Sequence, residues 1–529
     1  MNAKETIKSG KAVLGIEFGS TRIKAVLIDA DNKPIAQGSH TWENQLVDGL
    51  WTYSTEAIWY GLQDCYADLR KNVLAQYDVE IDTLAAIGIS AMMHGYLPFK
   101  GNDILVPFRT WRNTNTGKAA AALSELFNYN IPLRWSISHL YQAILDNEEH
   151  VSDIEFLTTL AGYIHWQLTG QKVIGVGDAS GMIPVDPATK TYDAEMVKKF
   201  NELIEPKNLP WKLLDILPKS LVAGENAGFL TPEGAMRLDV SGHLKPGIPF
   251  CPPEGDAGTG MTATNAVKVR TGNVSAGTSS FSMIVLEKPL SKPYEVLDMV
   301  TTPDGSLVAM VHCNNCTSDI NAWVKVLKEY AELLGVEQNT GELYTRLFEI
   351  AAKGDPDCGG LVSFNYISGE PVTGCMDGRP LIVRSANDKL TLANFMRAHL
   401  YGAIAVLKFG NDILLKEEGV KVDRLTGHGG YFTTPKVGQS MLAAALDSPI
   451  TVMETAGEGG AWGIALLAAF VVNNSNGYSL PDWLDNVVFA GNSGSTIAPN
   501  AEDVEGFNKY LENYKACLPI EQAAVENKK

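Results

Sequence analysis

Residues 12–29 read AVLGIEFGSTRIKAVLID, in which two apolar runs flank the polar turn Gly19-Ser20-Thr21. Alternating apolar residues on both sides of a short polar turn predict a β-hairpin. A similar unit recurs at Val269–Leu286, where two β-rich runs flank the turn Ser275-Ala276-Gly277-Thr278-Ser279. No short-period repeat accompanies the hairpins, so we expect two related halves rather than a solenoid.

The rest of the chain predicts alternating helices and strands around these hairpins. We expect helices at Thr55–Ala75, Thr116–Phe127, Ala194–Glu205 and Leu392–Lys416, and a strand at Leu84–Ser90. The proline-broken segment 128–253 is expected to elaborate the first half, and the seam between the halves is expected near Ala266. These patterns divide the chain into domains at 1–266 and 267–490, with a polar, peripheral tail at 491–529 that contains one helix over Glu502–Ala516.

Length and charge restrict what the protein can be. A chain of 529 residues exceeds a single core, because cores stop growing near ~250–300 residues. The formal net charge of −18 argues against nucleic-acid and anionic-membrane partners, which attract clustered Lys and Arg. Residues 1–12 lack the apolar core of a signal peptide, and the apolar stretch Ala461–Val472 is too short to span a bilayer. We therefore expect a cytoplasmic protein, and a homodimer is left open.

Seven cysteines in a chain of this kind are expected to be reduced thiols. Cys313 and Cys316 form a CxxC, a motif that can serve zinc binding or redox chemistry. No second CxxC or HxxxH supplies the remaining ligands of a zinc site. We favour the interpretation that both are buried thiols near a domain interface.

The two hairpin turns are candidates for phosphate binding. Turns of small residues present backbone N–H groups to phosphate oxygens, and the carboxylate of Glu17, just before the first turn, can serve a metal ion. Such turns also occur in hairpins that bind nothing, so one turn alone identifies no site. Two turns facing each other across a cleft would clamp a triphosphate, as in the actin-like (ribonuclease H-like) ATPases. The absence of GxxxxGK[ST], HRD and DFG motifs excludes a P-loop and a protein kinase. The expected fold class is α/β, with two actin-like ATPase domains and a central cleft.

Asp256 is the candidate catalytic base, in the stretch PPEGDAGTG at residues 252–260. Its flanking glycines let another molecule approach the backbone closely. An aspartate at a helix start would also lie at the positive end of the helix dipole. An ordinary helix N-cap is the competing interpretation, and the local sequence leaves both open.

Together these segments resemble the FGGY carbohydrate kinases, most closely their xylulokinase branch, over nearly the whole chain. The resemblance implies ATP as phosphate donor, Mg²⁺ held through Glu17, and Asp256 as the base. It also implies an ATP site formed by the two turns and by a Gly-rich adenosine segment at Gly427-His428-Gly429-Gly430, followed by Gln439 and Leu442. The ATP-binding residues implied in this way are Gly19, Ser20, Thr21, Gly277, Thr278, Ser279, Gly427, Gly429 and Gly430.

The sugar-binding segments resemble the same branch. Met92-Met93-His94-Gly95 is similar to a QMHG stretch in which Met-His touches the ketose, and Thr110-Trp111-Arg112-Asn113 stands where xylulokinases read Trp-Asn-Asp. The implied sugar-binding residues are Met93, His94, Trp111, Arg112 and Asn113. Asp178-Ala179-Ser180-Gly181 resembles the branch's DASG turn, for which we expect a structural role.

Two departures from the family pattern affect the expected chemistry. Glu17 stands where the family usually has Asp, so its carboxylate reaches one methylene further towards the metal. Asn113 replaces a carboxylate with an amide, which both donates and accepts, so the recognised hydroxyl pattern can differ. D-xylulose is the first expected substrate, with L-ribulose, another ketopentose or a sugar acid as alternatives. The rival functions are an actin-like ATPase without a sugar and a sugar sensor without catalysis, and the retained Asp256 speaks against the sensor.

Overall fold

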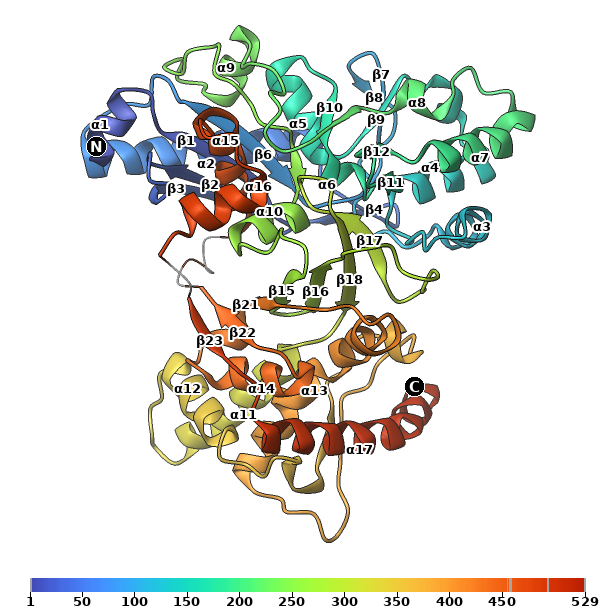
Figure 1. The fold of residues 1–529 in the computed structure, drawn as a ribbon, viewed down its shortest axis with the longest axis vertical. Coiled ribbons are helices and arrows are strands. Elements are labelled where there is room, and N and C mark those ends of the chain that lie inside the picture. Colours follow the sequence, from blue (N-terminus) through green and yellow to red (C-terminus); the bar gives the residue numbers. More distant parts are fainter. Residues whose placement is uncertain (1, 454, 456–458, 492–493, 528–529) are drawn as a thin grey trace.

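The computed structural model describes residues 2–453, 455, 459–491 and 494–527, and it shows two lobes, each built around one mixed β-sheet (Figure 1). The first sheet has the strand order β14 (Glu254–Gly255), β6 (Ala86–Ala91), β1 (Val13–Phe18), β2 (Arg22–Ile28) and β3 (Pro34–Thr41). The second has the order β17 (Asp298–Thr301), β18 (Leu307–Cys313), β16 (Ser280–Val285), β15 (Thr271–Ala276), β21 (Arg424–His428), β22 (Ile450–Val452) and β23 (Ser495–Ile497).

The two sheets share one topology. In the first, β1 pairs antiparallel with β2 and parallel with β6; in the second, β15 pairs antiparallel with β16 and parallel with β21. The next strands continue the pattern. β3 is antiparallel to β2 and β18 is antiparallel to β16, whereas β14 is parallel to β6 and β22 is parallel to β21. Both predicted hairpins are confirmed, and the duplicated topology is the one expected of two actin-like halves.

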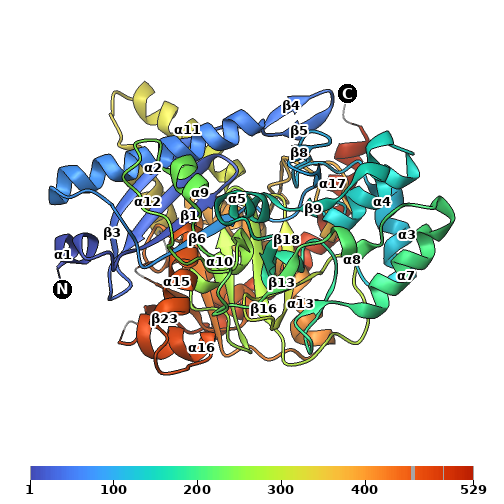
Figure 2. The ribbon, with the colours of Figure 1, turned by 90° about the horizontal axis from the view of Figure 1, so that it is seen from above.

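The expected helices are also present. They are α2 (Thr55–Tyr77), α3 (Gly117–Phe127), α7 (Ala194–Ile204) and α13 (Leu392–Asp412). The last of these continues to Glu417 as a π-turn and stops before Gly419, which has a φ of 64°. Residues 128–253 form the expected elaboration, in which α4 (Ser136–Leu145), α7 and α8 (Leu213–Ile216) lie on the side away from α1 (Ala3–Lys8) when seen from above (Figure 2).

The chain returns to the first lobe after completing most of the second. Helix α15 (Gly459–Asn473) packs against β1, β6 and α10 (Asp256–Ala263), although the sequence division places it in the second domain. The approach is close, since a Cβ on Gly15 would lie 2.1 Å from the Ala461 carbonyl oxygen. Glycine at position 15 therefore allows α15 to seat on the first sheet.

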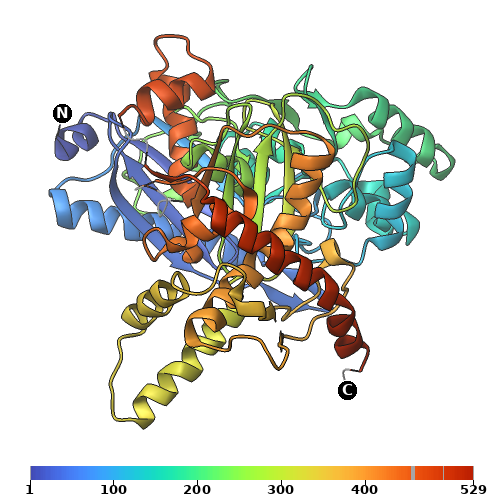
Figure 3. The same ribbon diagram turned by 60° about the horizontal axis from the view of Figure 1, so that its bottom comes forward.

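The tail is not peripheral, and this expectation was wrong. Its helix α17 (Ala501–Glu526) runs across the second lobe (Figure 3) and contacts α14 (Val437–Leu446) and β19 (Val362–Phe364). Phe507, Tyr510 and Tyr514 are fully buried in the second core. Apolar residues spaced three and four apart form a buried stripe even in a helix of polar average composition.

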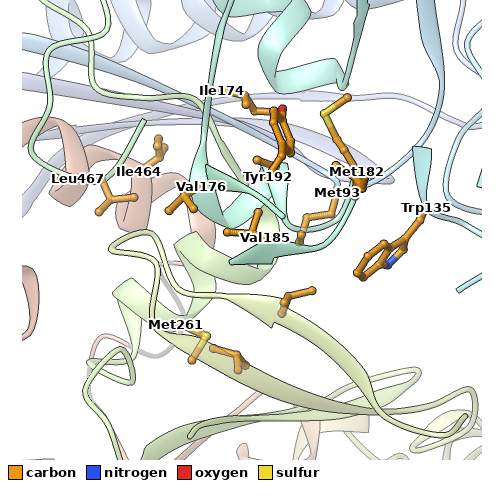
Figure 4. Close-up of a cluster of buried hydrophobic side chains, with 14 of the residues drawn as sticks. Met93, Trp135, Ile174, Val176, Met182, Val185, Tyr192, Met261, Ile464 and Leu467 are labelled. Atoms are coloured by element: carbon orange, nitrogen blue, oxygen red, sulfur yellow. The ribbon is translucent and has the colours of Figure 1, made fainter. Parts of the chain in front are cut away.

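One apolar cluster joins the two lobes beside the cleft. Figure 4 shows part of it, with Met93 and Trp135 from the first lobe and Met261 from α10. Met283 and Met310, from the second sheet, belong to the same cluster. Polar contacts add to it: the Thr301 N–H donates to Ser180 Oγ at 3.0 Å, and Arg134 forms an ion pair with Asp298.

Two further expectations concern cysteines and membranes. All seven cysteines are free, and the exposed fractions of Cys313 and Cys316 are 1% and 0%, so the prediction of buried thiols is confirmed. No three His, Cys, Asp or Glu side chains among the described residues are grouped so that they could hold a metal ion. Among the same residues, no helix combines the length and apolar character needed to cross a membrane.

Candidate active site

The candidate site lies where three parallel strands of the first sheet end. Glu17 and Glu254 both pair with Ser90, so β1, β6 and β14 end at the same edge of the sheet. Glu17 and Asp256 line a cavity of about 170 Å³ there. Its other lining residues come from α10, from the start of α15 and from the second sheet: Gly260, Ala263, Thr264, Asn273, Phe281, Met283, His428, Gly459 and Gly460. The cavity thus has one wall in each lobe.

Asp256 is the first residue of α10, and the N-cap position belongs to Gly255. Its Oδ1 accepts a hydrogen bond of 3.1 Å from the Met93 N–H, in the segment that follows β6. The carboxylate therefore does more than cap its own helix. Burial raises the pKa of Asp256, although the side chain is open to the water of the cavity. A carboxylate with a raised pKa is a stronger proton acceptor, as a general base requires.

Glu17 lies near Asp256 on the same side of the cavity. Burial, and then the Asp256 charge, raise the pKa of Glu17 to about 7. The Ala461 N–H, in the first turn of α15, donates to Glu17 Oε2 at 3.2 Å. A Cβ on Gly460 would lie 2.2 Å from Glu17 Oε1, so only glycine leaves room for the carboxylate there. Two neighbouring carboxylates that repel each other fit a divalent cation such as Mg²⁺, which neutralises both.

The two hairpin turns use their carbonyls; the Gly19 and Gly277 N–H groups donate within the turns, to Arg22 O and Ser279 O, and the amides that follow them are free among the described residues. In the first turn, Gly19 O accepts from Trp42 Nε1 at 2.8 Å and Ser20 O accepts from the Tyr53 hydroxyl at 2.6 Å. In the second, the Thr317 and Cys316 N–H groups donate to Gly277 O and Thr278 O, each at 2.9 Å. Within the described residues, the N–H groups of Ser20, Thr21, Thr278 and Ser279 have no acceptor. Hydrogen bonds to their carbonyls therefore hold both turns in place, and their free N–H groups can donate to phosphate oxygens.

The Gly-rich segment lies beside the second turn. Gly429 has a φ of 102°, and a Cβ there would lie 2.5 Å from the Ala276 carbonyl oxygen. Glycine is required at this position both for its backbone conformation and for the close approach. Gly430 faces open space, whereas Gly427 packs against the Phe432 ring. Gln439 has a structural role, because its Nε2 donates to Ile450 O and Ser495 O at 2.7 and 2.6 Å.

Met93 contacts Asp256 through its backbone N–H, and His94 follows it in the chain. His94 has a φ of 70°, which turns the chain sharply after β6, and its Nδ1 lies 3.1 Å from Gly181 O. Its ring stacks on Trp135 with the centroids 6.2 Å apart. Burial lowers the pKa of His94 to about 3, so the ring is neutral. The neutral His94 ring lies on the Trp135 indole, and the neighbouring residue, Met93, contacts Asp256 through its backbone. Such a ring can recognise a hydroxylated ligand.

The Trp111–Asn113 segment is placed differently from the expectation. Trp111 Nε1 donates to Ser20 Oγ at 3.3 Å, which sets it beside the first turn. The exposed Arg112 guanidinium stacks 3.9 Å above the Trp51 ring. Asn113 Oδ1 accepts from the Trp51 N–H at 2.8 Å, and its Nδ2 donates to Trp51 O and Thr110 O at 2.8 and 3.0 Å. The role expected for Asn113 as a sugar reader is therefore corrected, because backbone groups already engage its amide.

Several polar residues around the site were assigned no role there from the sequence. Asn273 and His428 line the cavity from the second lobe. Asp178 and Glu254 are buried carboxylates behind Asp256; Glu254 accepts from the Gly177 and Asp178 N–H groups at 3.2 and 3.0 Å. Asparagine is depleted in strands, so an asparagine within the strand TGNVSA is unusual, and this signal could have identified Asn273.

The buried Asp178 gives a testable pH dependence. Burial raises the pKa of Asp178 from 3.8 to about 7, so above pH ~4 the folded state binds a proton that the unfolded state has released. The stability from this protonated carboxyl is complete below pH ~4 and is lost as pH rises through about 7. We therefore expect the melting temperature of the parent, minus that of Asp178→Asn, to fall between these pH values when both are free of ligand.

The difference between the two proteins is needed because buried histidines such as His94 and His139, with lowered pKa values, titrate in this range with the opposite sign. Thermal melts across the range check the prediction, and a difference that stays constant or grows with pH contradicts it.

Comparison with known families agrees with this geometry. Residues 12–261 match the profile of the N-terminal domain of the FGGY family of carbohydrate kinases, and residues 272–472 match the profile of its C-terminal domain. No curated protein matches the chain significantly.

Solved structures show the same fold at low sequence identity. A xyloylose kinase from Brucella ovis superposes with a TM-score of 0.77 at 18% identity, covering 97% of this chain and 100% of that one. A gluconate kinase from Lactobacillus acidophilus gives 0.78 at 17% identity, with 96% and 98% covered. Glycerol kinase from Plasmodium falciparum, solved with ADP, gives 0.74 at 16% identity, with 97% and 98% covered.

Proposed function

Because the chain belongs to the FGGY family of carbohydrate kinases, which use ATP, we propose that it phosphorylates a ketose, with D-xylulose as the preferred substrate and D-xylulose 5-phosphate as the product. One contact carries the proposal: the Met93 N–H donates to Asp256 Oδ1 at 3.1 Å. This contact joins the His94 segment, which suits a sugar, to the carboxylate that suits proton transfer. The inter-lobe cavity beside them accommodates the phosphate donor.

In the proposed mechanism, Asp256 accepts the proton of a sugar hydroxyl as that oxygen attacks the γ-phosphorus of ATP. The free N–H groups of Ser20, Thr21, Thr278 and Ser279 hold phosphate oxygens from the two lobes. Mg²⁺ supplies the positive charge that phosphoryl transfer requires, and Glu17 is the residue that would hold it. His94 and Trp135 orient the sugar, and the apolar cluster beside them excludes water from that side.

A neutral sugar suits the site better than a sugar acid. Arg134 lies close enough to His94 and Asp256 to influence their charges, but it is paired with Asp298. Its charge is therefore compensated before any substrate binds. This argument puts D-xylulose and L-ribulose ahead of gluconate-like acids.

A coupled assay of ADP release over ketopentoses, hexuloses, polyols and sugar acids tests the proposal. We expect the highest kcat/KM with D-xylulose. Turnover that requires a different sugar would correct the substrate, whereas ATP hydrolysis that no sugar changes would contradict the kinase reaction itself.

Substitution of Gly181 should weaken sugar binding selectively. A Cβ at this position would lie 2.7 Å from His94 Nδ1 and 2.8 Å from Met93 Cε, so Gly181→Ala displaces the imidazole. Loss of a well-placed hydrogen bond costs ~1–3 kcal/mol, so we expect sugar KM to rise roughly ten- to a hundredfold. Affinity for ADP should change less than about twofold, because Gly181 does not line the inter-lobe cavity.

His94→Asn is the companion variant, since asparagine tolerates a positive φ and removes the ring without straining the turn. It should reproduce the rise in sugar KM. Steady-state kinetics and calorimetry separate the two affinities, and a rise in the ADP dissociation constant in both variants would place this segment on the nucleotide side.

A further inference from the structure

The second-lobe wall of the cavity carries two polar side chains, Asn273 and His428, to which the family resemblance assigns no individual contact, although His428 lies within the Gly-rich segment. Asn273 lies on β15 and His428 at the end of β21, and both line the cavity. The strands are parallel, with Asn273 opposite Thr426 and Ser275 opposite His428. Because side chains alternate along a strand, these residues share one face of the sheet, and that face is turned towards Glu17 and Asp256.

Asn273 is buried without a partner. Its exposed fraction is 0%, yet neither Oδ1 nor Nδ2 has a hydrogen-bond partner among the described residues. His428 Nε2 is also buried and unpaired within the described part of the chain. Buried polar groups are nearly always satisfied, so two unsatisfied groups on one cavity wall indicate that something else completes them.

The carboxylates on the opposite wall of the cavity indicate which kind of ligand these two side chains would contact. Glu17 and Asp256 are acceptors when ionised, so together they favour a cation between the walls. Burial lowers the pKa of His428 to about 4, which leaves a neutral ring whose Nε2 can accept a hydrogen bond from water. The amide oxygen of Asn273 can do the same. A magnesium ion keeps several of its waters when bound, and these waters are donors that match such acceptors.

We propose that Asn273 and His428 bind the hydration shell of the magnesium ion that accompanies the nucleotide, from the lobe opposite Glu17. This inference rests on the proposed kinase function and adds to it a contact from the second lobe. The metal-bound waters would then connect the two sheets, so that the cation is fully held only when both walls are in place.

Asn273→Leu separates this role from a structural one. Leucine has the same branched arrangement of side-chain heavy atoms and leaves no unpaired polar atom, so the variant without ligand should melt at the temperature of the parent or above it. Its dissociation constant for ADP, measured by calorimetry with excess Mg²⁺, should rise about tenfold. In EDTA, the constants of parent and variant should agree within about twofold.

Thr426→Val is the matched control. Thr426 is equally buried, its Oγ1 is also unpaired among the described residues, and it lies opposite Asn273, but it does not line the cavity. The control should leave the affinity for ADP with magnesium unchanged. His428→Phe should repeat the magnesium-dependent loss seen for Asn273→Leu.

Each of the other possible outcomes would overturn the inference. Parental affinity of Asn273→Leu for ADP with magnesium overturns the inference, and so does a loss of equal size in EDTA. A lowered melting temperature with unchanged affinity shows a structural amide and also overturns it. If the parent itself fails to bind ADP with magnesium, the proposed function fails and the inference fails with it.

Discussion

The Asp256→Asn variant is expected to fold and to bind both sugar and nucleotide, yet to turn over about 10²–10⁴ times more slowly. A sugar hydroxyl is a poor nucleophile at neutral pH and must lose its proton as the bond to phosphorus forms. The amide keeps the shape of the carboxylate, and its oxygen can still accept from the Met93 N–H, so the local structure should persist. What it loses is the capacity to take the proton.

The control for this experiment is Asp178→Asn, the same chemical change at a carboxylate that is buried and does not line the cavity. It should retain turnover within a few-fold of the parent. Melting temperatures and sugar-dependent ADP release are measured for both variants. Near-parental turnover of a folded Asp256→Asn protein would contradict the mechanism, and a large loss in the control would show that the effect is not specific to Asp256.

Replacing Glu17 with Gln is expected to have the next largest effect, through the metal. Removal of the charge should lower the apparent affinity for Mg²⁺ roughly 10- to 100-fold, the range typical for lost metal-site interactions. Glu17→Asp should be milder, because it keeps the charge and shortens the reach by one methylene. Magnesium titrations of activity, and of ADP binding by calorimetry, measure both effects.

Glu17 also predicts a pH dependence of metal binding. Its pKa of about 7 means that protons compete with Mg²⁺ for the carboxylate as pH falls below that value. Apparent Mg²⁺ affinity of the parent should decrease on acidification, and Glu17→Gln should lack this component. Equal activity of Glu17→Gln and parent at limiting magnesium would remove Glu17 from the metal site.

The features that were predictable from sequence are those with a local signature. Each hairpin combines apolar alternation with a turn of small residues, and both were identified, as was the helix that ends before Gly419. Asp256 lines the inter-lobe cavity, and the glycines around it allow close packing, since a Cβ on Gly255 would lie 2.1 Å from Met93 Cγ; its role as the base stays a prediction.

What the sequence could not reveal depends on long-range partners. Asn113 has the right chemistry for a sugar contact, but its amide is taken by the Trp51 backbone, 62 residues earlier. Trp135 resembled any other buried aromatic until its ring was found stacked on His94. The unpaired amide of Asn273 becomes visible only when β15 is placed opposite Glu17. Such roles are set by tertiary neighbours, which residue type alone does not specify.

The return of α15 to the first sheet determines when each lobe can finish folding during translation. The first sheet lacks a cover over β1 and β6 until the ribosome has made residues as far as Asn473, and the second core lacks Tyr514 until later still. Neither lobe can therefore complete its fold early and independently, whereas many multidomain chains fold domain by domain from the N-terminus during synthesis. A nascent chain of this protein therefore carries an open hydrophobic surface on its first sheet until late in its elongation.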